Sequence, residues 1–151
     1  MLPPDHEPGT PIPMIVVQYH SYGFLRGGTG DEYPIHLFAR HGFAVLSVER
    51  PPFITAGRTD FQTWGEIVAA EYRDWGEKKS VLSSLVAGVE TAITTGNVDR
   101  ARIGITGLSD GATSARFALI NTRMFAAAAI STCCLEPKTV MTYGGMAWAT
   151  Y

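Results

Sequence analysis

The fold is decided by the stretch Ile103-Gly-Ile-Thr-Gly107-Leu-Ser109-Asp-Gly111-Ala112, which contains the pattern Gly-x-Ser-x-Gly. An apolar run at residues 102–106 precedes the pattern, and a helix-like run at residues 112–120 follows it. A strand, a tight turn and a helix in that order are what a nucleophile elbow requires. The sequence therefore predicts that Ser109 is held in a strained conformation, with its hydroxyl exposed above the end of a strand. A purely structural Gly-rich turn is the alternative.

Gly107 and Gly111 fit this interpretation, because side chains on either side of Ser109 would clash with the strand and the helix. The helix N-terminus behind the serine favours developing negative charge. Acyl transfer also needs hydrogen-bond donors for the tetrahedral oxyanion, and the backbone N–H of Asp110 is one of them. We expect the second donor in the Gly-rich loop that follows an apolar strand at residues 14–19. The candidates are the Tyr19 phenol, the Tyr22 phenol and the His20 imidazole.

Short apolar runs alternate with helix-like segments along the chain. Continuous apolar runs of this kind are typical of strands that are buried on both faces of a parallel sheet. The predicted strands are residues 14–19, 43–48, 102–106 and 125–131, and the predicted helices are residues 33–40, 64–79, 81–95 and 112–120. This alternation predicts an α/β fold with a mostly parallel sheet and right-handed crossovers. Residues 132–151 show no clear period and are left unassigned.

The composition excludes several function classes. A net charge of -2 over 151 residues gives no reason to expect nucleic acid or an anionic membrane as a partner. We see no apolar run long enough to span a membrane and no signal peptide at the N-terminus, so a soluble protein of the cytoplasm or the periplasm is expected. The adjacent Cys133 and Cys134 do not suit a disulfide, and no ligand spacing predicts a metal site.

Both ends of the chain predict that it is part of a longer protein. Residues 1–13 hold five of the nine prolines, which indicates an extended linker from a preceding domain. A serine nucleophile needs a base, and in this elbow arrangement the partners follow in the order Ser, Asp or Glu, and His. The four histidines, His6, His20, His36 and His41, all precede the serine, and the only acids after it are Asp110 and Glu136. We therefore expect a fragment of a catalytic domain that is inactive on its own.

Three blocks of the chain, residues 13–22, 41–46 and 98–111, resemble the prolyl oligopeptidase family of serine peptidases. Members of that family are α/β-hydrolases preceded by a β-propeller. The resemblance implies a three-layer sandwich that is incomplete at its C-terminus, with residues 14–151 as the N-terminal part of the peptidase domain and a propeller upstream. It implies no cofactor. In such enzymes the tyrosine six residues after the proline that opens the strand donates to the oxyanion, and that tyrosine corresponds to Tyr19.

Within that family, residues 19–30, 107–112 and 130–137 are similar to lasso peptide isopeptidases. This implies a peptide substrate, and specifically hydrolysis of the isopeptide bond that closes the macrolactam ring of a lasso peptide. Two departures from the wider family, His20-Ser21 for Gly-Gly and Ala112 for a second glycine after the elbow, should reshape the pocket but leave the nucleophile in place. The alternatives are a dipeptidyl or acylaminoacyl peptidase, an esterase of the same fold, or a non-catalytic α/β binding domain.

Overall fold

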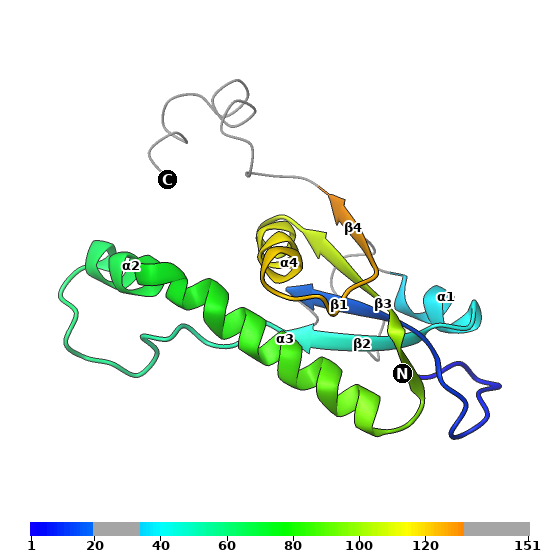
Figure 1. The fold of residues 1–151 in the computed structure, drawn as a ribbon. Helices are drawn as coiled ribbons and strands as arrows, with labels where there is room; N and C mark the ends of the chain where they lie inside the picture. Colours follow the sequence, from blue (N-terminus) through cyan, green and yellow to red (C-terminus); the bar gives the residue numbers. More distant parts are fainter. Residues whose placement is uncertain (20–33, 132–151) are drawn as a thin grey trace.

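A computed structural model describes residues 1–19 and 34–131, which form a four-stranded sheet with helices on both faces (Figure 1). The strands lie in the order β2-β1-β3-β4, and every neighbouring pair is parallel. The bounds of the strands are Ile12–Tyr19 (β1), Ala44–Glu49 (β2), Val98–Leu108 (β3) and Ala127–Ser131 (β4). The alternating α/β architecture with a parallel sheet predicted from the sequence is therefore confirmed.

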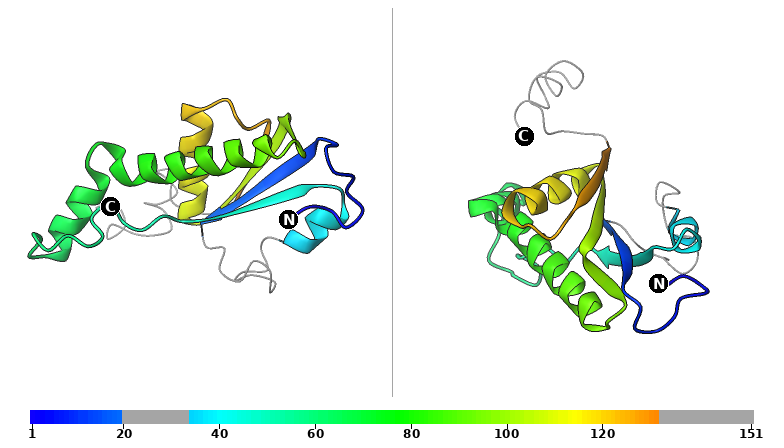
Figure 2. Two further views of the ribbon diagram at one scale, coloured as in Figure 1. Left: turned by 90° about the horizontal axis from the view of Figure 1, so that it is seen from below. Right: turned by 45° about the vertical axis from the view of Figure 1, so that its right-hand side comes forward.

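The helices divide into two layers. The short α1 (Ile35–Arg40) lies on one face of the sheet, while α3 (Gly76–Thr94) and α4 (Asp110–Asn121) cover the other (Figure 2). Helix α2 (Trp64–Tyr72) precedes α3 and extends past the end of the sheet. The result is a three-layer arrangement of helix, sheet and helix. Among the described residues, no helix has the length and apolar character needed to cross a membrane.

Both faces of the sheet are apolar. Successive residues of a strand point to opposite sides, and apolar residues of β1 occur on each side. In β1, Met14 and Val16 belong to the core cluster shared with α3 and α4, whereas Val17 packs with α1. The larger core includes Val81, Leu85 and Val89 of α3, Ile103 and Ile105 of β3, and Ala115 and Ala118 of α4. This burial on both sides explains why β1 is a continuous apolar run rather than an alternating one.

The Pro-rich N-terminal segment joins the sheet earlier than the apolar run alone indicates. Strand β1 begins at Ile12, two residues before the predicted start. Residues 1–11 contain no helix or strand, but Met1 is hydrogen-bonded to Val45 in both directions, with N-to-O distances of 2.8 and 2.9 Å. Asn97 accepts a further bond from the Gly9 N–H.

The predicted helix at residues 64–79 is wrong in its extent, because the chain breaks inside it. Helix α2 ends at Tyr72, a 3-10 turn η2 covers Arg73–Trp75, and both Asp74 and Trp75 have positive φ angles. Tertiary contacts explain the break. The buried Glu71 carboxylate accepts bonds from the backbone N–H groups of Ile54 and Thr55, which ties the end of α2 to the preceding loop. Helix α3 then starts in a new direction at Gly76.

The strand order creates the edge at which a site can form. From β1, the chain moves to β2 on one side and then crosses to β3 on the other side, with α1 on one face of the sheet and α3 on the opposite face. In open α/β sheets, ligands bind at the carboxyl ends of strands where the order reverses in this way. The ends of β1 and β3 at Tyr19 and Leu108 lie at that point.

Candidate active site

Ser109 lies at the junction between β3 and α4, where it is the N-cap residue of the helix. Its φ of 55° and ψ of -126° are a combination that residues other than glycine rarely adopt and that costs about 1–3 kcal/mol. Serine N-caps normally use their hydroxyl to accept a bond from the first turn of the helix. The Ser109 side chain makes no such bond, so the hydroxyl is not used as a cap. A strained strand-to-helix turn with a serine that does not cap the helix is what a nucleophile elbow requires.

The turn around Ser109 is tight enough to require glycine on both sides. A Cβ placed on Gly107 would lie 2.6 Å from the Gly111 carbonyl oxygen and 2.9 Å from the Cα of Ala112. A Cβ on Gly111 would lie 2.9 Å from the Cβ of Tyr19. Real Cβ atoms essentially never approach other atoms this closely, and most of these neighbours are backbone. The two glycines of the motif therefore permit the contact of strand, helix and β1.

We expect Gly107→Ala to destabilise the protein by about 1–3 kcal/mol, because its methyl group would overlap backbone atoms that cannot move aside. Gly104→Ala is the matched control in the same strand, since the nearest atom to its Cβ would be the Ala127 carbonyl oxygen at 3.6 Å. Urea unfolding of the two variants measures the difference. Equal stabilities would show that the elbow relaxes around a side chain at position 107.

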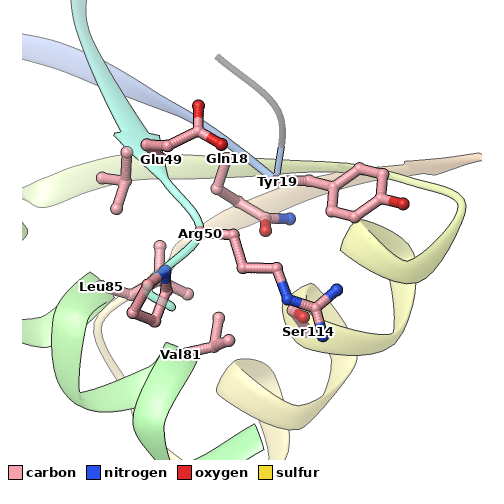
Figure 3. Close-up of a pocket in the computed structure, with 9 residues that line it drawn as sticks. Gln18, Tyr19, Glu49, Arg50, Val81, Leu85 and Ser114 are labelled. Carbon is pink, nitrogen blue, oxygen red and sulfur yellow. The ribbon is translucent and has the colours of Figure 1, made fainter. Parts of the chain in front are cut away.

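Tyr19, the last residue of β1, faces the elbow from the neighbouring strand. Its φ of 99° is positive, and its Cβ and Cγ pack against Gly111 in the first turn of α4. Figure 3 shows the ring directed along that turn. The Tyr19 carbonyl oxygen accepts a bond from the Arg50 N–H at 3.1 Å, which fixes the end of β1 against the end of β2. The other two candidate donors, His20 and Tyr22, lie outside the described residues.

The Asp110 carboxylate belongs to a closed ring of four charges, which we call the charge ring. Asp110 lies 2.6 Å from the Arg50 Nη1 and 2.7 Å from the Lys78 Nζ. Glu77 completes the ring, at 2.5 Å from the Arg50 Nη2 and 3.1 Å from the Lys78 Nζ. These residues come from the position directly after β2, the first turn of α3 and the first residue of α4. The ring therefore fastens the residue that follows Ser109 to two other elements.

Two members of the charge ring are almost completely removed from water. The side chains of Glu77 and Lys78 are only 5% and 4% exposed, so they are energetically dependent on their partners. Glu77 and Lys78 were not predicted from the sequence to be part of a site. One signal was present: Lys78 shares its helical face with Val81, Leu85 and Val89, which are all buried. A lysine on the apolar face of a helix indicates an internal partner.

A small cavity lies between the charge ring and the strand ends. Gln18, Tyr19, Glu49, Arg50, Val81 and Ser114 are among the residues that line it (Figure 3). Across residues 1–19 and 34–131, the carboxylate and imidazole side chains form no group that could hold a metal ion. Among the described residues, the groups gathered at the ends of β1 and β3 include the Tyr19 phenol, the Ser109 hydroxyl and the Asp110 backbone N–H.

Comparison with known proteins identifies relatives of this chain. A model of the prolyl oligopeptidase family matches residues 35–150. The lasso peptide isopeptidase AtxE2 of Asticcacaulis excentricus is 44% identical over 148 residues. The match includes 96% of this chain but 21% of that protein, so the chain spans about a fifth of the relative's length. These findings confirm the resemblances that the sequence motifs indicated.

Solved structures agree with the fold. The AtxE2 isopeptidase without ligand has a TM-score of 0.83 and 41% identity, covering 98% of this chain and 24% of the solved one. A serine-to-alanine variant of AtxE2 with astexin3-dC4 bound matches with the same TM-score and identity. A putative dienelactone hydrolase from Klebsiella pneumoniae has a TM-score of 0.54 at 17% identity, covering 83% of this chain and 50% of its own, and shows the fold alone. The predicted α/β-hydrolase fold is confirmed.

Proposed function

This chain belongs to the prolyl oligopeptidase family, and from that premise we propose that it forms the N-terminal part of a serine peptidase domain that hydrolyses isopeptide bonds of lasso peptides. The observation that carries the catalytic proposal is the conformation of Ser109. Its backbone is strained and its hydroxyl does not cap α4, and a purely structural turn needs neither feature. The similarity to a lasso peptide isopeptidase over nearly the whole chain supports the substrate class.

The proposed reaction proceeds through an acyl-enzyme. The Ser109 oxygen attacks the carbonyl carbon of the isopeptide bond while its proton passes to a general base, and the amine leaves with a proton from that base. Water then repeats the sequence on the ester and releases the carboxylate. The Asp110 N–H and the Tyr19 phenol hold the oxyanion in both steps. The base and its orienting carboxylate are assigned to sequence that follows Ser109 in the full-length protein.

The proposed domain organisation follows from the same family membership. Residues 14–151 are assigned to the peptidase domain, together with Ile12 and Pro13 of β1, and residues 1–11 to a linker from an upstream β-propeller. The relative that was solved with astexin3-dC4 carries an alanine in place of a serine, which fits a nucleophilic serine in this family. A peptide bound by that relative supports a peptide substrate here.

The experiment is to incubate the full-length protein with a lasso peptide such as astexin3-dC4 and to follow the mass of the peptide. Opening of the macrolactam adds one water, and an unthreaded chain results. A fluorophosphonate probe should modify Ser109, and Ser109→Ala should abolish both the opening and the labelling. The linear form of the same peptide is the control for ordinary peptidase activity. Ring opening by Ser109→Ala, or preferential cleavage of the linear peptide, would overturn the proposal.

A further inference from the structure

The Gln18 side chain joins β1 to both sides of the nucleophile elbow. Gln18 is the penultimate residue of β1 and is only 2% exposed. Its Nε2 donates one hydrogen bond to the Thr106 carbonyl oxygen at 2.9 Å and another to the Gly111 carbonyl oxygen at 2.7 Å. Both partners are carbonyl oxygens, which can accept from the amide nitrogen but not from the amide oxygen, so they fix the orientation of the amide.

These two carbonyls bracket Ser109. Thr106 lies three residues before the serine at the end of β3, and Gly111 lies two residues after it in the first turn of α4. A single amide that holds both of them fixes the angle between strand and helix, which is the angle that presents the serine hydroxyl. Thr106 is tied to β1 a second time, because its hydroxyl donates to the Val16 carbonyl oxygen at 3.1 Å.

Gln18 is also directly connected to the proposed oxyanion donor. Its neighbour Tyr19 has a positive φ, as Ser109 does. The two hydrogen bonds of the Gln18 amide, which we call the amide bridge, therefore connect two segments that each contain a strained residue. Strained conformations of this kind persist only where the surrounding structure determines them. The approach is close, because a Cβ on Gly111 would lie 3.1 Å from the Gln18 Nε2 and 2.9 Å from the Tyr19 Cβ.

We propose that Gln18 is a positioning residue that sets where the Ser109 hydroxyl lies relative to the Tyr19 phenol. This inference rests on the proposed function, in which both groups act on the same carbonyl. The Gln18 amide nitrogen is already engaged by two backbone carbonyls, so we assign Gln18 the role of positioning other groups. It acts by holding the elbow at the distance from β1 at which attack on the carbonyl and stabilisation of the oxyanion occur together.

The test is the steady-state kinetics of Gln18→Met in the full-length protein, with active sites titrated by a fluorophosphonate so that kcat refers to folded enzyme. Methionine keeps the length of the side chain but removes both donors. We expect kcat to fall about 10- to 100-fold, because small misplacements of reacting groups have effects of this size. KM should change little, since binding of the ground state does not depend on the bridge. Gln62→Met, at the exposed glutamine before α2, is the control and should behave as the wild type.

Gln18→Asn provides a second variant in case the methionine variant does not fold. It retains the amide but is one methylene shorter, so it can reach at most one of the two carbonyls. The proposal requires a fall in kcat that is smaller than that of Gln18→Met. It also requires that the loss caused by Gln18→Met be smaller in a Tyr19→Phe background, because the two residues act through the same geometry.

The outcomes separate this inference from the function on which it rests. If the wild type opens the lasso peptide and labels at Ser109 while both Gln18 variants keep the wild-type kcat, the positioning role is overturned and the proposed function stands. A rise in KM with unchanged kcat would also overturn it. If the wild type neither labels at Ser109 nor opens the peptide, the proposed function itself fails.

Discussion

Tyr19→Phe is expected to lower kcat of the full-length enzyme by about 10²- to 10³-fold, or roughly 3–4 kcal/mol of transition-state stabilisation. The variant removes only the hydroxyl and keeps the ring that packs on Gly111. A donor at this position strengthens as the carbonyl oxygen becomes an oxyanion, so it acts on the transition state more than on the bound substrate. The expected signature is therefore a fall in kcat with little change in KM, measured on a lasso peptide substrate.

Tyr22→Phe is the comparison that tests the assignment of the oxyanion donor. Tyr22 lies three residues further along the sequence than Tyr19, and we expect its hydroxyl to matter far less. If Tyr22→Phe were the impaired variant, the strand register that selects Tyr19 would be incorrect. If neither variant lost activity, the second donor would be a backbone N–H group or His20.

Lys78→Met is expected to destabilise the protein by about 3–5 kcal/mol, because it leaves Arg50 alone to compensate two carboxylates, one of which is buried. Lys78, like Arg50, contacts both acidic members of the charge ring, at 2.7 Å for Asp110 and 3.1 Å for Glu77. Of these two acids, Glu77 suffers more, since it has almost no access to water. Urea unfolding, followed by hydrogen exchange of the α3 and α4 amides, measures the loss in the part of the protein that the ring holds.

Arg100→Met is the control for the charge ring. Arg100 pairs with Glu90 at 2.5 Å, but their side chains are 63% and 42% exposed, and such pairs contribute about 0–1 kcal/mol. A double variant, Glu77→Leu with Lys78→Met, removes one charge of each sign and should be more stable than Lys78→Met alone. If Lys78→Met were no more destabilising than Arg100→Met, water would be compensating the ring.

The sequence was sufficient to predict the elements that depend on local patterns. The apolar runs identified all four strands, and the Gly-x-Ser-x-Gly spacing placed the strand-to-helix turn at Ser109, because only glycine fits on either side of it. The two ends of β1 show what local sequence patterns cannot predict. The start at Ile12 depends on pairing with Val98, and the role of Gln18 depends on carbonyls 88 and 93 residues away.

Long-range contacts also explain the features that the sequence did not predict. The break between α2 and α3 occurs at Asp74 and Trp75, and positive φ is unusual for a tryptophan, although aspartate adopts it more often than most residues. The conformation is imposed by the attachment of Glu71 to the loop around Thr55. The charge ring joins residues from β2, α3 and α4, and no local pattern shows that Arg50 and Asp110 will meet.

The close contact between Gly111 and Tyr19 has a consequence for how this protein can evolve. A side chain at position 111 becomes acceptable only after the end of β1 has moved, and that movement displaces the tyrosine ring. Neither the new side chain nor the movement of β1 is favourable on its own, because a protein with only one of the two changes has a disturbed site. Positions 18, 19 and 111 should therefore behave epistatically. A lineage can acquire a larger residue at position 111 only if another group has already replaced the Tyr19 phenol in its proposed role.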